Sequence, residues 1–117
     1  MKKKLIIVLA IAITGVLAAC SKSSDGGGGT PAANCSTTQK FGADVNPIIQ
    51  ANCTNAGCHD AISSNGPGAL ITYQRIFDAR TSIRAAVSSG LMPKDHSLTP
   101  AQKTAIICWI DQGAPNN

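Results

Sequence analysis

The run Cys53-Thr54-Asn55-Ala56-Gly57-Cys58-His59 places two thiols and an imidazole within seven consecutive positions. Each thiol can add to one vinyl group of a porphyrin, and the histidine that follows can then bind the iron from below. The usual attachment run is C-x-x-C-H, whereas the spacer here has four residues and ends in a glycine. Such a spacer can bulge outward while both sulfurs still reach the ring. The run therefore predicts covalent attachment of one haem.

Two other interpretations of the same run stay open. In the first, Cys53 and Cys58 form a local disulfide and His59 is an ordinary surface residue. In the second, the three side chains belong to a metal site, although a structural zinc ion requires four ligands. The rest of the chain has to distinguish among the three.

The first 19 residues are expected to be a lipoprotein signal peptide that is cleaved before Cys20. Three lysines at positions 2–4 precede an apolar run over 5–17, and Leu17-Ala18-Ala19-Cys20 resembles the lipobox of bacterial lipoproteins. This run is too short and wrongly flanked for a membrane span. Cys20 is therefore the predicted site of lipidation, and Ser21 favours the outer membrane. The alternative is an ordinary export signal with an unrelated cysteine.

Residues 20–34 are expected to form a flexible tether rich in glycine and serine, followed by one folded domain over 35–117. The full chain carries ten basic and six acidic residues, and loss of the first 19 residues removes three lysines, which leaves seven against six. A chain so close to neutrality has no basic patch for nucleic acid. Export also provides an oxidising compartment in which disulfides persist.

The first helix is predicted over 44–52, with Asp44 as its cap and Pro47 in its first turn. Val45, Ile48 and Ile49 would form its apolar face, and the helix would run directly into Cys53. A turn-rich loop is expected over 60–69.

Three further helices are predicted downstream. Thr72 is expected to cap a short helix over 73–78, and Thr81 or Ser82 a second one over 83–89 that ends at Gly90. Thr99-Pro100-Ala101-Gln102 has the pattern of a capping box and predicts a final helix that stops at Gly113. The final helix would present Ala105, Ile106, Trp109 and Ile110 as one stripe. No run alternates as a strand would, so the fold class predicted is all-α.

The sixth iron ligand is predicted to be Met92. It lies in Gly90-Leu91-Met92-Pro93, where glycine and proline favour a loop that can present one side chain inward. A thioether raises the potential of a histidine-ligated haem. The competing ligand is His96, in a polar stretch where a solvent-exposed histidine is expected.

Once Cys20 is assigned to lipid and Cys53 and Cys58 to haem, Cys35 and Cys108 remain as an even pair. A disulfide between them is expected, since exported chains form and keep such bonds. The rival assignment adds a second disulfide between Cys53 and Cys58.

The segments 45–49, 53–59, 91–93 and 98–115 resemble a class I cytochrome c domain of the kind found in bacterial lipoproteins. The resemblance implies a small helical domain wrapped around one covalent haem c, in which the first and last helices cross. It makes Cys53 and Cys58 the thioether sites, His59 the proximal ligand and Met92 the distal ligand. Such domains transfer single electrons and catalyse no reaction alone.

The function predicted is therefore that of a membrane-anchored, mono-haem electron carrier, not an enzyme, which exchanges electrons with redox proteins of the cell envelope. Two alternatives are kept. One is a haem protein with an open distal face, which would act as a peroxidase or sensor. The other is a disulfide-stapled helical lipoprotein without haem, which would act as an interaction module.

Overall fold

The computed structural model describes residues 33–117. The predicted signal peptide, the lipidation site at Cys20 and nearly all of the tether lie outside the described residues. In chain order, the described part contains a π-helical turn η1 (Phe41–Val45) and the helices α1 (Asn46–Asn52), α2 (Tyr73–Asp78), α3 (Arg80–Ser89) and α4 (Pro100–Asp111). It contains no strand, which confirms the all-α prediction for residues 33–117.

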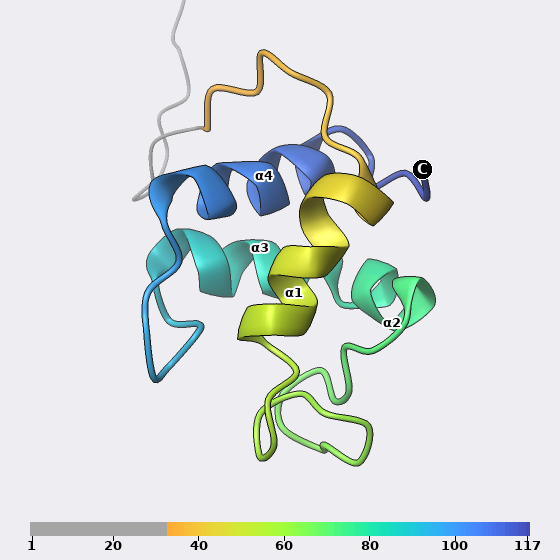
Figure 1. Ribbon diagram of the computed structural model, residues 1–117, viewed down its shortest axis with the longest axis vertical. Coiled ribbons are helices and arrows are strands. Elements are labelled where there is room, and N and C mark those ends of the chain that lie inside the picture. The colour runs from red at the N-terminus through yellow and green to blue at the C-terminus, as the bar shows by residue number, and fades with distance from the viewer. Residues whose placement is uncertain (1–32) are drawn as a thin grey trace, which may run out of the picture.

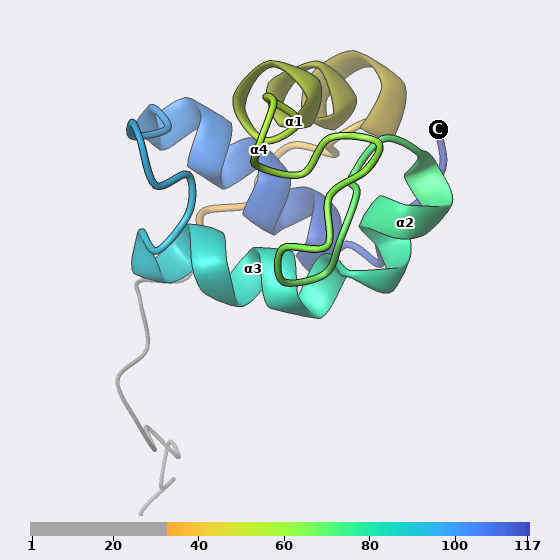
Figure 2. The same ribbon diagram turned by 90° about the horizontal axis from the view of Figure 1, so that it is seen from below.

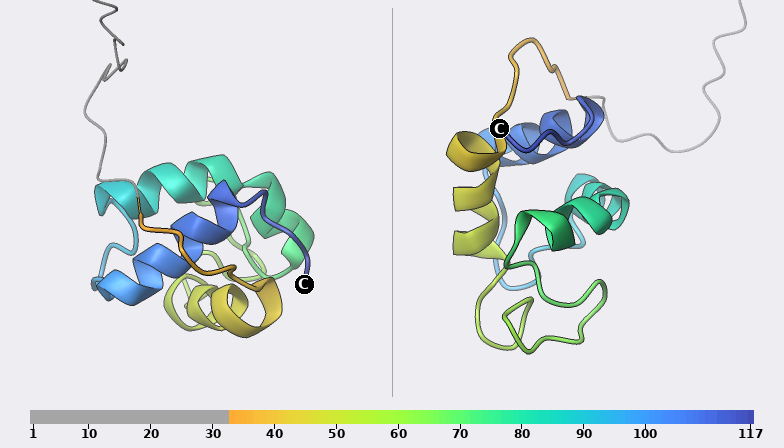
Figure 3. Two further views of the ribbon diagram at one scale, coloured as in Figure 1. Left: turned by 90° about the horizontal axis from the view of Figure 1, so that it is seen from above. Right: turned by 90° about the vertical axis from the view of Figure 1, so that its right-hand side faces the viewer.

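The helices are arranged around the pair formed by α3 and α4, which run side by side (Figure 1). The turn η1 packs against α4, and α2 packs against α3. Helix α1 continues from η1 and stands at a steep angle to α4 (Figure 3). The loop over 53–72 leaves the end of α1 and lies across the side of the molecule between α1 and α3 (Figure 2).

The first helical segment begins earlier than predicted. Helical turns start at Phe41, and Asp44 lies inside them, where its carboxylate accepts a hydrogen bond from the Lys40 N–H at 2.7 Å. The prediction that Asp44 caps a helix starting after it was therefore wrong. The cause is distant in sequence: Asn117 accepts hydrogen bonds from the N–H groups of both Phe41 and Gly42 and so caps this end.

Helix α3 also starts before its predicted position. Neither Thr81 nor Ser82 caps it, because a single residue, Ala79, both ends α2 and begins α3 at Arg80. Two other predicted boundaries of α2 and α3 are confirmed. Thr72 accepts a hydrogen bond at the start of α2, and Gly90 ends α3 with a φ of +76°.

Helix α4 matches its prediction at both ends. Thr99 and Gln102 form the reciprocal capping box, and Gly113 follows the helix with a φ of +96°. Its buried face differs in part, since Ile107 is also buried whereas Ala105 and Ile110 are only half-buried.

All four aromatic residues of the sequence pack together at one end of the helices: Phe41, Tyr73, Phe77 and Trp109. The Phe41 ring lies 5.0 Å from Tyr73 and 5.3 Å from Trp109 between ring centroids. Two polar atoms of the cluster hold the C-terminal segment, because the Tyr73 hydroxyl donates to the Ala114 carbonyl and the Trp109 indole to that of Pro115. The cluster thus joins η1, α2, α4 and the residues after α4.

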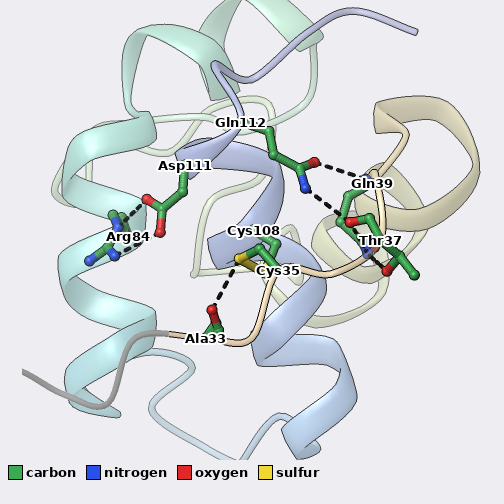
Figure 4. Close-up of a disulfide and its surroundings, with 8 residues drawn as sticks. All are labelled: Ala33, Cys35, Thr37, Gln39, Arg84, Cys108, Asp111 and Gln112. Carbon is green, nitrogen blue, oxygen red and sulfur yellow. Dashed lines mark hydrogen bonds and ion pairs between the residues drawn. A yellow bond between two sulfur atoms is a disulfide. The ribbon is translucent and has the colours of Figure 1, made fainter.

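A disulfide links Cys35, in the extended segment before η1, to Cys108 on α4 (Figure 4). This is the pair expected from the sequence. Beside it, Gln112 accepts from the Gln39 N–H and donates to the Thr37 carbonyl, so the segment is fixed along α4 by both covalent and hydrogen bonds. Among residues 33–117, no helix has the length and apolar character needed to cross a membrane.

Candidate functional site

The spacer between the two free cysteines forms a closed loop at the end of α1. Cys53 is the residue that ends α1, and its carbonyl accepts a hydrogen bond from the His59 N–H at 3.0 Å. Within this loop the Cys58 N–H donates to the Asn55 carbonyl, and Gly57 adopts a φ of +80°. The spacer, which is two residues longer than usual, therefore forms an outward turn. The backbones of Cys53 and His59 meet where this turn closes.

Cys58 is held from the other side by the loop that follows. Its carbonyl accepts hydrogen bonds from the Ser63 hydroxyl and from the Asn65 side-chain amide. Asn65 also donates to the Gly57 carbonyl, and Asp60 accepts from the Gly57 N–H. These contacts fix the backbone of the second cysteine without using its sulfur atom.

His59 is the one buried polar or charged side chain found in residues 33–117, with 8% exposure. Its Nδ1 lies 2.8 Å from the Gly68 carbonyl oxygen. A carbonyl can only accept, so Nδ1 carries a proton, and in the neutral imidazole Nε2 then carries the lone pair. Nε2 makes no hydrogen bond within the described chain, and no fully buried side-chain nitrogen there lacks a partner, so this atom is accessible. This is the arrangement that a metal-binding histidine requires.

Both thiols of the loop are free and half-buried. Burial, with a smaller contribution from the neighbouring Cys58, raises the pKa of Cys53 to about 11. Cys53 also packs against the hydrophobic core, so any group attached to it would lie against apolar side chains.

Met92 lies on a separate loop between α3 and α4. Its N–H donates to the Ala86 carbonyl at 3.2 Å, which ties the start of this loop to α3, and its side chain is half-buried. His96 is exposed, as expected, yet its Nε2 lies 3.0 Å from the Oδ1 of Asn52, the last residue of α1. The loop is thereby attached to the residue that precedes Cys53.

The structure therefore gathers Cys53, Cys58 and His59 in one hydrogen-bonded loop and leaves Met92 on another. Cys35 and Cys108 are joined to each other and are not part of this loop. The roles of Asn52 and Gly68 were missed in the sequence. The glycine and asparagine content of 63–68 indicated a turn, but nothing local indicated which carbonyl would face His59.

A cavity of about 360 Å³ lies beside the loop that holds His59, with Pro67, Arg75, Asp78, Ala79 and Ser82 in its walls. The Arg75 guanidinium makes no hydrogen bond or ion pair within residues 33–117. The other arginines of this part are engaged: Arg84 with Asp111, and Arg80 over the Phe77 ring. The cavity thus carries in the same wall one carboxylate, from Asp78, and one guanidinium, from Arg75, that makes no hydrogen bond in the described part of the chain.

Within the described part, no three side chains of His, Cys, Asp or Glu gather as they would around a bare metal ion. Comparison of the chain with protein-family models, with curated proteins and with solved structures found no match.

Proposed function

We propose that this chain is a membrane-anchored, mono-haem c-type cytochrome that carries single electrons between redox proteins of the cell envelope. Cys53 and Cys58 would hold the haem by two thioether bonds, and His59 and Met92 would bind its iron. The anchor would be the acylated Cys20.

The observation that carries the proposal is the environment of His59. A buried imidazole with Nδ1 bonded to a backbone carbonyl and with an accessible Nε2 lone pair is oriented as an iron ligand is. Two free thiols, Cys53 and Cys58, precede it in the same hydrogen-bonded loop. Cys35 and Cys108 are joined, as expected in an oxidising compartment. In such a compartment, thioether bonds to the haem would hold Cys53 and Cys58 in a stable form.

The residues of the chain would perform distinct tasks. The hydrogen bond between His59 and Cys53 sets the attachment loop, and the Gly68 carbonyl orients the imidazole. Arg75, in the wall of the neighbouring cavity, would be the cation available to a carboxylate group of the haem. A bound haem supplies a one-electron couple, and two protein ligands leave no iron position open for a substrate.

The test is a pyridine haemochrome spectrum of full-length protein produced with a cytochrome c maturation system. The sample is denatured and extracted with acid acetone before measurement. A c-type α-band that stays with the polypeptide is expected, and it should be lost in the Cys53→Ser, Cys58→Ser double variant. Cys35→Ser, Cys108→Ser is the matched control and should retain it. A colourless protein, or pigment that is removed by extraction, contradicts the proposal.

A second candidate function is a disulfide-stapled helical lipoprotein that serves as an interaction module without haem. It is favoured by the aromatic cluster, because Trp109 is fully buried and Phe41 nearly so among side chains of the protein itself. The same spectrum separates the two, since this candidate predicts a colourless protein with Cys53 and Cys58 joined.

A further inference from the structure

The loop between α3 and α4 carries two side chains that can bind iron, Met92 and His96, four positions apart. His96 is exposed, so burial does not keep its imidazole from other partners. Imidazole binds iron well, and a thioether is the softer ligand. If Met92 is to bind the iron, another residue must therefore keep His96 from binding it.

Asn52 supplies that restraint in the structure. Its side-chain nitrogen donates to the Ile48 carbonyl one turn earlier in α1, at 2.7 Å. This bond orients the amide, so the group that faces His96 Nε2 at 3.0 Å is the Oδ1 oxygen. The half-buried Asn52 is thus fixed on a helix, and it directs an acceptor at the histidine.

The acceptor also decides the tautomer of His96. Because Oδ1 can only accept, Nε2 must carry the proton, and the nitrogen has no lone pair to offer a metal. Binding iron through Nε2 would require the hydrogen bond to break, the Nε2 proton to pass to water and a proton to be taken up at Nδ1. The two histidines are therefore held in opposite states: His59 with Nε2 ready to bind, and His96 with Nε2 blocked.

We propose that Asn52 is a positioning residue that selects the sixth iron ligand, holding His96 Nε2 so that Met92 takes the iron. The proposal rests on the proposed haem-binding function and adds to it the basis of ligand choice. Asn52 is suited to this task because it immediately precedes Cys53, so the restraint is applied beside the attachment site.

The experiment compares ferric wild type with Asn52→Ala, the double variant Asn52→Ala, His96→Ala and the conservative variant Asn52→Asp. The near-infrared sulfur-to-iron band and the reduction potential are measured for each. Asn52→Ala should lose the band, remain low-spin and shift to lower potential, because His96 replaces Met92. The double variant should recover the band, since no imidazole is left to compete. Asn52→Asp keeps an acceptor oxygen and should retain the band.

Asn116→Ala is the matched control, since Asn116 is exposed, lies outside the attachment loop and makes no side-chain hydrogen bond in residues 33–117; it should behave as wild type. A wild-type band that persists in Asn52→Ala overturns the inference. So does a band that is lost equally in the single and double variants, because Asn52 would then act on structure alone. Failure of the proposed function is distinct, since wild type would then contain no covalent haem. Haem content and far-ultraviolet circular dichroism of each variant establish that it has folded.

Discussion

The Nδ1 of His59 lies 2.8 Å from the carbonyl oxygen of Gly68, nine positions further along the chain. This contact fixes both the tautomer and the orientation of the imidazole, so the geometry of the proposed proximal ligand depends on the loop that contains Gly68. Gly68 has a φ of +82°, a conformation that other residues adopt only with strain.

Gly68→Ala should therefore affect the candidate site as well as stability. Gly90→Ala, at a φ of +76° on the end of α3, is the matched control for backbone strain. Both substitutions should lower the free energy of unfolding by about 1–2 kcal/mol. Only Gly68→Ala should also change the yield of covalent haem or the reduction potential. If both variants leave these two properties unchanged, the contact does not position a ligand.

Met92→Ala should leave the haem attached but open its distal face. The backbone contact to Ala86 does not involve the Met92 side chain, so the loop should keep its anchor to α3. We expect loss of the near-infrared band and rapid binding of carbon monoxide to the ferrous form. Leu91→Ala is the control, because Leu91 is the exposed neighbour. Retention of the band in Met92→Ala would assign the sixth position to another residue.

Cys53 should react slowly with alkylating reagents in protein produced without haem. Its pKa of about 11 follows mainly from burial, so at neutral pH it holds about 100-fold less thiolate than an ordinary cysteine. In the Cys58→Ser variant the rate of iodoacetamide labelling should keep rising until the pH approaches this value. A plateau near the ordinary value of 9.0 would show that the thiol is not buried as described.

Removal of the disulfide should cost stability without removing the haem. The bond joins residues 73 positions apart, and chain-entropy estimates for such a loop give about 4 kcal/mol. Denaturant unfolding of Cys35→Ser, Cys108→Ser should show a loss of about 2–4 kcal/mol, whereas the haemochrome spectrum should be unchanged. A loss well below 1 kcal/mol would mean that the segment along α4 is held chiefly by the Gln112 hydrogen bonds.

The ion pair between Arg84 and Asp111 should make a small, pH-dependent contribution. The hydrogen bond from Arg84 lowers the pKa of Asp111 below its usual value of 3.8, but both side chains are more than one third exposed. The pair should therefore contribute less than about 1 kcal/mol. Because the folded-state pKa is lowered, this stability is present above the usual value and is lost as the pH falls through the lowered one.

Arg84→Met should accordingly destabilise the protein slightly at pH 7 and not at all once Asp111 is protonated. Urea unfolding at several pH values measures the difference between variant and wild type. Lys103→Met serves as the control for loss of one positive charge, since Lys103 makes no ion pair in residues 33–117. A difference that is constant with pH would show that the Arg84 side chain stabilises by packing instead.

The sequence predicted those features of the fold that depend on neighbours within about four positions. The capping box of Thr99 and Gln102, the cap at Thr72 and the glycine stop at Gly90 are all such contacts, and each is present. Helix boundaries set from a distance were missed. The first helical turn begins at Phe41 because Asn117 caps it, and no pattern near Phe41 indicates that partner.

The candidate site likewise has features that near neighbours determine and features that distant residues determine. The loop from Cys53 to His59 and its outward bulge follow from the order of residues and one glycine. The Gly68 carbonyl and the Asn52 amide are brought to the two histidines by the path of the loops, over separations of 9 and 44 positions. Both groups act through their orientation, which a sequence pattern does not encode.

The disulfide of Cys35 and Cys108 has a topological consequence. It closes residues 35–108 into a covalent ring that contains both proposed thioether cysteines and both candidate distal ligands. A protease that cuts this ring once, for example at the loop where Ile62 is 92% exposed, opens the ring but releases no fragment. The nicked molecule should migrate as one chain until a reductant is added. While the disulfide is intact, the segment that contains Cys35 stays joined to α4, so a single backbone cut would not detach α4 from the proposed lipid anchor.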